Sequence, residues 1–197
     1  MVFAKQNARC VKAGYTLVEV LVVVSIMGIL SAMGVAGLQR AVANARIKDA
    51  AVNTAAFVER VANLANQRNE VLCLRVAPGS NSQKLYVVRD AGDETCANPS
   101  SGIIDSLVID APCKYISLAS CGAVDVDWFS TSYSSDKAFK PRLGLSAAPP
   151  QGGICIQYGD DGVYGAVLKE KLVNRVKPMW KVGNDPTSGG WSSWTEL

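Results

Sequence analysis

Residues 15–38 read YTLVEVLVVVSIMGILSAMGVAGL, and this stretch decides the fold class. Within it, Val20–Leu38 is a run of 19 residues without a charged side chain. An α-helix rises about 1.5 Å per residue, so roughly 20 apolar residues cross a hydrocarbon core about 30 Å thick. A helix of a soluble protein does not need so continuous an apolar surface. The run therefore predicts a membrane-spanning helix near the N-terminus.

The apolar segment has more than one interpretation, and Glu19, at the start of the predicted helix, helps to choose among them. A cleaved secretory signal peptide fits the basic start of the chain, but its apolar region usually has only about 7–15 residues. An ordinary signal-anchor helix explains the length of the run and gives the carboxylate no partner. A carboxylate at the end of a membrane segment costs on the order of 1–3 kcal/mol, depending on its depth. Neither interpretation explains why Glu19 is there.

A third interpretation supplies a partner for this carboxylate. Cleavage between Gly14 and Tyr15 would place a new α-amino group four residues before Glu19 on the same helix. When such helices bundle, Glu19 of one subunit can approach the amine of another. An ion pair in a low dielectric is stronger than in water, so the pair would fix the axial register between neighbours.

The residues around this junction resemble a known signal. Lys12-Ala13-Gly14, followed by Tyr15-Thr16-Leu17-Val18-Glu19 and a long apolar helix, is similar to the type III signal of the type IV prepilin and pseudopilin family. The resemblance implies that a prepilin peptidase cuts after Gly14 and methylates Tyr15. It also implies that Glu19, with Thr16, serves assembly. Tyr15 replaces the usual phenylalanine, and Ala36 stands where many members have proline.

The resemblance also implies partners and a location. The partners would be other pilin or pseudopilin subunits, the prepilin peptidase and an inner-membrane assembly platform. Lys5, Arg9 and Lys12 precede the helix and should stay in the cytoplasm, which places the C-terminal head in the periplasm. The chain would be a single-pass inner-membrane protein first and part of a pilus or pseudopilus afterwards. No cofactor is expected.

The segment after the apolar run predicts how a head is attached. From Ile47 to Ala65, apolar residues recur at the i, i+3, i+4, i+7 spacing of an amphipathic helix, and the first proline is Pro78. We expect one helix from about Tyr15 to Arg68, followed by short β-strands whose alternate residues cover one face of the helix. The predicted strands are 71–76, 84–90, 103–109, 123–129, 153–158 and 163–169, with a hairpin at 159–162.

These elements define an α+β, pilin-like fold with a long N-terminal helix packed on an antiparallel β-sheet head. The expected parts are a leader (1–14), a transmembrane or filament-core helix (15–38), an amphipathic helix (39–68) and a β-rich head (69–197). Residues 62–73, ANLANQRNEVLC, resemble the GspH/FimT-type minor pseudopilins, in which a paired Arg-Asn ends the helix. A major pilin remains the alternative.

Charge and composition exclude several other functions. The formal charge is +3, and residues 1–14 carry three basic side chains and no acid. The rest of the chain is therefore neutral, which argues against a general polyanion-binding protein. The chain has no histidine, which removes histidine-based triads and zinc sites. No constellation of catalytic groups stands out, so no enzyme is predicted.

One basic stretch keeps a nucleic-acid function open. Basic side chains next to an aromatic ring can hold single-stranded DNA by phosphate contact and base stacking, and some FimT-type relatives serve DNA uptake. A solvent-exposed strand face is the simpler explanation. The residues are Lys169, Lys171, Arg175, Lys177 and Lys181, around Trp180.

The cysteines predict disulfides. Cys10 lies in the leader, and the five others are dispersed without a CxxC pair, which in an exported domain favours disulfide bonds over metal binding. Five is odd, so at least one thiol stays free or pairs elsewhere. Cys113 and Cys121 are close in sequence and form the disulfide we expect first.

Two further groups of residues have simple explanations. The acids Asp90, Asp93 and Glu94, and separately Asp160 with Asp161, could ligate calcium, but they match no EF-hand spacing, so exposed acidic turns are favoured and no metal site is predicted. The tryptophans near the C-terminus could anchor other subunits or pin the tail to the head, and the second is favoured. They are Trp180, Trp191 and Trp194.

Overall fold

The computed structural model describes most of the chain after the first 13 residues. The described ranges are 14–77, 82–92, 96, 99–121, 138–141, 152–160, 162–169, 175–182 and 193–197. One long helix, α1, spans Leu17–Arg68 and has 52 residues. By its contacts the chain divides into two compact units, residues 1–41 and 42–197.

The first unit contains the apolar part of α1. Large hydrophobic side chains are exposed all along it, among them Leu17 at 81%, Leu21 at 61% and Met33 at 72%. Among the described residues, α1 is the one helix long and apolar enough to cross a membrane. An apolar surface on all sides of a helix is stable when lipid or other helices cover it. The predicted apolar helix is confirmed.

The C-terminal end of α1 is fixed by its capping residues. Asn69 has a φ of 51°, a left-handed conformation that asparagine adopts more readily than most residues. The Asn69 N–H donates to the carbonyl of Asn66 at 3.3 Å, and the Glu70 N–H donates to that of Ala65 at 3.2 Å. These two bonds form a Schellman motif, which satisfies the last carbonyls of the helix. The predicted end at Arg68 is therefore confirmed.

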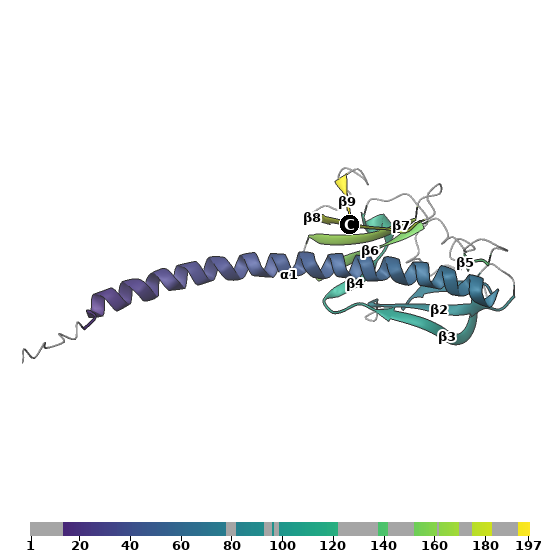
Figure 1. The fold of residues 1–197 in the computed structure, drawn as a ribbon, viewed down its shortest axis with the longest axis horizontal. Coiled ribbons are helices and arrows are strands. Elements are labelled where there is room, and N and C mark those ends of the chain that lie inside the picture. The colour runs from purple at the N-terminus through teal and green to yellow at the C-terminus, as the bar shows by residue number, and fades with distance from the viewer. Residues whose placement is uncertain are drawn as a thin grey trace, which may run out of the picture. The chain divides into compact units, whose positions relative to one another are not determined.

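The head contains antiparallel sheets packed on α1, which confirms the predicted α+β fold class, but there are two sheets where the sequence led us to expect one. The four-stranded sheet has the order β3-β2-β1-β5 and the five-stranded sheet the order β4-β6-β7-β8-β9. Figure 1 shows the two sheets on opposite sides of the second half of α1. The strands are β1 (Leu72–Val76), β2 (Lys84–Asp90), β3 (Pro99–Val108), β4 (Cys113–Ile116), β5 (Ala138–Phe139), β6 (Gly152–Tyr158), β7 (Val163–Lys169), β8 (Lys177–Val182) and β9 (Thr195–Glu196).

A wide buried arc on α1 explains why two sheets pack on it. Buried residues come in consecutive pairs that recur every three or four positions: 50/51, 54/55, 57/58 and 61/62. Consecutive residues of a helix point about 100° apart, so such pairs cover more than one stripe. Side chains from both sheets join α1 in one core, for example Leu74 and Val87 from one sheet and Ile154 and Val167 from the other.

Most strands agree with the sequence prediction. β2 and β7 have the predicted bounds, β1 and β6 differ by one residue, and the β6–β7 hairpin is confirmed. β3 begins four residues earlier than predicted. The predicted strand at 123–129 lies outside the described residues. The short β4 and the Lys- and Pro-containing β8 were missed because neither has the run of branched residues that predicts a strand.

Gly153 lets β6 and β7 pair closely. A Cβ on Gly153 would lie 2.5 Å from the backbone oxygen of Val167.

Because a backbone atom cannot move without breaking the strand pairing, we expect Gly153→Ala to lower the free energy of unfolding by about 3 kcal/mol, as other overpacked cores do. Gly102→Ala is the matched control, since Gly102 also lies in a strand and nothing lies within 4 Å of where its Cβ would be. Denaturant unfolding of the detergent-solubilised chain measures both, and equal stabilities would contradict this packing.

A buried hydrogen bond joins α1 to β4. The Thr54 and Tyr115 hydroxyls lie 3.0 Å apart, and Thr54 Oγ1 also donates to the carbonyl of Ala50 at 2.7 Å. Burial raises the pKa of Tyr115, and the hydrogen bond to Thr54 opposes this. The tyrosine therefore stays neutral in the folded head at pH values where an unfolded tyrosine ionises.

We expect Tyr115→Phe to cost about 1 kcal/mol at pH 7, because it removes one buried hydrogen bond. The pH dependence has a definite sign. The folded pKa is raised, so the stability contributed by neutral Tyr115 is complete below the unfolded pKa of about 10 and falls as the pH rises above it. The wild type should lose more stability than Tyr115→Phe between pH 9 and 11 (roughly one unit either side of that pKa). Parallel curves for the two chains would rule out this role.

Candidate functional site

Gly14 and Tyr15 lie directly before the first turn of α1. Both are exposed, and Tyr15 keeps 83% of its surface accessible. Nothing lies within 4 Å of where a Cβ on Gly14 would be. An exposed peptide bond outside regular structure is accessible to a protease, so the predicted cleavage junction stands at an open position.

Thr16 has a local role that sequence reasoning did not assign. Its Oγ1 accepts the backbone N–H of Glu19 at 3.2 Å, and its carbonyl accepts the N–H of Val20 at 3.2 Å. Thr16 is therefore the N-cap of α1, and Thr16-x-x-Glu19 has the sequence of a capping box. The Thr-x-x-Glu spacing is the sequence signal that could have predicted this N-cap. A threonine here stabilises the first turn, next to the junction.

The Glu19 side chain is exposed in the first turn of α1, beside the exposed Val18 and Val20. An acid in the first turn is favoured by the positive end of the helix dipole. Among the ion pairs within the described part of the chain, none contains Glu19. The helix therefore presents a carboxylate on an apolar surface without an ion-pair partner in its own described chain.

Comparison with known protein families identifies the N-terminal segment. Residues 9–35 match the family model of the prokaryotic N-terminal methylation motif. The N-terminus is prepilin-like. The match includes Gly14, Tyr15, Thr16 and Glu19 and ends inside the apolar run. No curated protein and no solved structure matches the chain. The motif, the apolar helix and the α+β head together make this a prepilin-like protein with a pilin-like fold.

The basic stretch is less exposed than the sequence suggested. Lys169 is only 3% exposed, on β7, so its placement on a solvent face is wrong. Arg175 forms an ion pair with Glu196. Lys177 and Lys181 are half-buried on β8, and Lys171 lies outside the described residues. A DNA-binding surface along this stretch stays a prediction that the described residues do not support.

The C-terminal tryptophans belong to the head. Trp180 packs against the core around α1, and the Lys48 ammonium lies 3.8 Å from the centre of its ring. Trp194 is 6% exposed in a second core cluster, close to where β9 pairs with β8. Trp191 lies outside the described residues. The described part of the tail is thus pinned to the head, as favoured from the sequence.

The disulfide predicted between Cys113 and Cys121 is wrong. The structure pairs Cys121 with Cys155 and Cys73 with Cys96, and leaves Cys113 free and buried. Cys113 belongs to the core around α1, whereas Cys121 and Cys155 belong to the cluster on the other face of the five-stranded sheet. The sheet therefore separates Cys113 from Cys121.

Cys113 behaves as a core residue. Burial raises the pKa of its thiol, the Arg46 guanidinium opposes this, and Asp110 and Asp49 raise it further. The Arg46 side chain donates to the carbonyl of Ala111 at 2.9 Å. A thiol that stays protonated is a poor nucleophile, so Cys113 is not a candidate for covalent chemistry.

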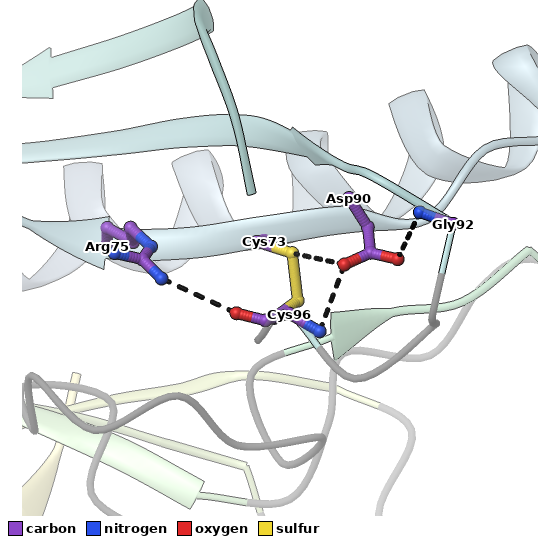
Figure 2. The surroundings of a disulfide bond; sticks show 5 residues. All are labelled: Cys73, Arg75, Asp90, Gly92 and Cys96. Carbon is purple, nitrogen blue, oxygen red and sulfur yellow. Dashed lines mark hydrogen bonds between the residues drawn. A yellow bond between two sulfur atoms is a disulfide. The ribbon is translucent and has the colours of Figure 1, made fainter. Parts of the chain in front are cut away.

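Asp90 lies beside the Cys73–Cys96 disulfide and is only 7% exposed, so its prediction as part of an exposed acidic turn is wrong. Figure 2 shows its carboxylate between the disulfide and the turn at Gly92. Oδ2 accepts the Gly92 N–H and Oδ1 the Cys96 N–H, each at 3.1 Å, and the Cys73 Sγ lies 4.0 Å from Oδ1. Arg75 donates to the Cys96 carbonyl at 3.4 Å.

The other acidic turns are only partly described. Asp160 is fully exposed and pairs with Lys114 at 3.1 Å, as expected of a surface acid. Asp93, Glu94 and Asp161 lie outside the described residues. The acid that matters structurally is therefore Asp90, which sequence spacing alone could not distinguish from its neighbours.

Proposed function

We propose that the protein is a structural subunit, a minor pilin or pseudopilin, of a type IV pilus or a type II secretion pseudopilus. The observation that carries the proposal is the methylation motif at 9–35, directly before an exposed apolar helix. A prepilin peptidase removes residues 1–14 and methylates the new α-amine of Tyr15. Residues 15–38 first anchor the precursor in the inner membrane and later form filament core. The head, residues 69–197 with the amphipathic helix 39–68, faces the periplasm.

Glu19 sets the register of assembly in this proposal. In the precursor its carboxylate lies at the end of a membrane segment, where it is costly to keep unpaired. After cleavage, the Tyr15 amine of one subunit and the Glu19 carboxylate of the next neutralise each other inside the helix bundle. Such a pair forms only at one axial offset between neighbours, because charge pairing in low dielectric depends strongly on distance. Partners are other subunits and the inner-membrane assembly platform.

A minor subunit of the GspH/FimT type is the finer proposal. It is supported by residues 62–73, in which α1 ends at Arg68, Asn69 caps it, and β1 brings Cys73 into a disulfide. A major pilin has the same N-terminal motif and is the alternative. Abundance distinguishes them, since a major subunit forms most of the purified filament mass and a minor subunit a small fraction.

The mature N-terminus tests the proposal. The full chain is expressed in cells with an active prepilin peptidase. The product that contains the C-terminal head is then analysed by mass spectrometry. We expect a chain that begins at Tyr15 and carries one methyl group on its α-amine. Cells with an inactive peptidase are the control and should yield only the uncut chain. A product that begins at Met1, or at a cut beyond Leu30, would refute the assignment.

A further inference from the structure

Two cysteines and a carboxylate from three separate segments meet in the head. Cys73 lies on β1, Asp90 is the last residue of β2, and Cys96 lies six residues after Asp90. Their sulfur and carboxylate donor atoms all lie within 4.8 Å of one another, and all three residues are buried. Figure 2 shows the three side chains directed toward one point. In the oxidised chain the two sulfurs form a disulfide.

The same three side chains form a different site when the cysteines are reduced. Two thiolates and a carboxylate would place three negative donors in the interior, where unpaired charge is costly. A tetrahedral zinc ion, with bonds of about 2.3 Å to sulfur and 2.0–2.2 Å to oxygen, needs donor atoms roughly 3.5–3.8 Å apart. The three donors thus lie close enough to surround such an ion after side-chain rotation.

The Asp90 carboxylate is already oriented for this role. The Gly92 amide holds Oδ2 and the Cys96 amide holds Oδ1, and the Cys73 sulfur lies 4.0 Å from Oδ1. A carboxylate has about four lone-pair sites, so it can ligate a cation while it keeps its backbone hydrogen bonds. Ligands fixed by such bonds bind metal more tightly than ligands that must be ordered on binding.

We propose that the reduced chain binds a thiophilic divalent cation, zinc above all, through Cys73, Cys96 and Asp90, and that disulfide formation displaces it. Thiolates select zinc over magnesium and calcium. The three protein ligands leave a fourth position for water. The bound ion holds β1, the end of β2 and Cys96 in their native arrangement before the disulfide exists.

The exchange of metal for disulfide is a two-electron oxidation. The chain is made in a reducing compartment, where its cysteines are thiols or metal-bound thiolates. A disulfide of the thiol–disulfide oxidoreductase class accepts two electrons from the Cys73 and Cys96 thiolates and two protons from solvent, and becomes a dithiol. The Cys73 and Cys96 sulfurs form their bond, and zinc leaves as the hydrated ion. Metal and disulfide therefore exclude each other, because a disulfide sulfur is no longer a thiolate ligand.

Cobalt(II) is the probe that tests this site, because its tetrahedral thiolate complexes absorb light and zinc displaces it. The full chain with Cys10→Ser is purified in detergent, reduced, freed of metal and titrated anaerobically. We expect one equivalent of cobalt with thiolate-to-cobalt absorption, and loss of that signal on adding zinc. Asp90→Asn should weaken binding at least tenfold.

Matched variants separate this cluster from the other cysteines. Cys121→Ser with Cys155→Ser removes the second pair and should keep the cobalt absorption, whereas Cys73→Ser should lose it. The oxidised chain should bind no cobalt, and this comparison needs no substitution that could impair folding. The proposal would be overturned if the reduced chain showed no thiolate-to-cobalt absorption, or if Cys73→Ser kept that absorption. It would also be overturned if Asp90→Asn bound cobalt as tightly as the wild type.

A second readout follows the oxidation itself. Glutathione disulfide is added to the reduced chain with and without one equivalent of zinc, and free thiols are counted by alkylation and mass spectrometry. Zinc should slow formation of the Cys73–Cys96 disulfide severalfold and leave the Cys121–Cys155 disulfide unaffected. Equal slowing of both disulfides, or of neither, would also contradict the site.

Discussion

A Glu19→Val variant is expected to insert into the membrane at the wild-type level and to enter filaments at least tenfold less than the wild type. Insertion depends on the apolar run, which valine extends. In the proposed function, incorporation depends on the ion pair with a neighbouring α-amine. Removing one partner of a buried pair leaves the other charge uncompensated, which costs about 3–5 kcal/mol. Since about 1.4 kcal/mol corresponds to a tenfold change, tenfold is a lower bound.

Ser25→Val is the matched control for this variant. It also replaces a polar side chain on the same exposed helix with valine. The Ser25 hydroxyl, however, donates to the carbonyl of Leu21 in its own helix at 2.8 Å, so it needs no partner from another subunit. We expect normal incorporation of Ser25→Val, measured by immunoblotting sheared filaments against membranes. Normal incorporation of Glu19→Val would refute the role of its carboxylate.

Replacing both Cys121 and Cys155 by alanine is expected to lower the free energy of unfolding of the head by about 4 kcal/mol. The disulfide joins residues 34 positions apart, and closing a loop of that size in the unfolded chain corresponds to roughly 4 kcal/mol in the chain-entropy model. The bridge also ties the short 3-10 helix Leu118–Cys121 to β6, in a core cluster that contains Leu118 and Leu168. Denaturant unfolding of the solubilised chain measures the loss.

Cys113→Ala is the control for the disulfide variant. Cys113 is also a buried cysteine of the five-stranded sheet, but it has no disulfide partner. Its replacement removes only one sulfur from the core and should cost about 1 kcal/mol. Peptide mapping of the unreduced chain should link Cys121 to Cys155. A peptide linking Cys113 to Cys121, with a larger loss in Cys113→Ala, would contradict the observed pairing.

Local patterns in the sequence were enough to predict α1 and the strands β1, β2, β6 and β7, but they missed β4 and β8. The apolar run and the spacing from Ile47 to Ala65 predict α1, because helix periodicity is set by residues three and four apart. Alternating branched residues predict β2 and β7, and the turn between Tyr158 and Val163 predicts the β6–β7 hairpin. The junction proposed at Gly14 and Tyr15 could be predicted because the methylation motif, matched at residues 9–35, is contiguous in sequence.

The contacts between distant segments could not be predicted in this way. Cys113 and Cys121 are near each other in sequence, yet Cys113 lies on β4 in the core around α1, whereas Cys121 lies in the following 3-10 helix and in the core cluster on the other face of the sheet. Which face of a strand meets α1 depends on tertiary packing and not on local sequence. The pairing of Cys73 with Cys96 and the burial of Asp90 depend on the register of β1 with β2. Two sheets rather than one follow from the consecutive buried pairs on α1, and the alanines in these pairs, Ala50, Ala51, Ala55 and Ala62, are weak sequence signals because their side chains are small.

The central claim is contact between the Tyr15 amine of one subunit and the Glu19 carboxylate of another, and a hydrophobic carbodiimide tests it most directly. This reagent joins a carboxylate to an amine only where the two already touch. Assembled filaments are treated, digested and analysed by mass spectrometry. The account predicts a peptide in which the Tyr15 α-amine of one chain is bonded to the Glu19 side chain of another. The account would be contradicted if the reagent joined other carboxylate–amine pairs in the filaments but linked no Tyr15 amine to Glu19.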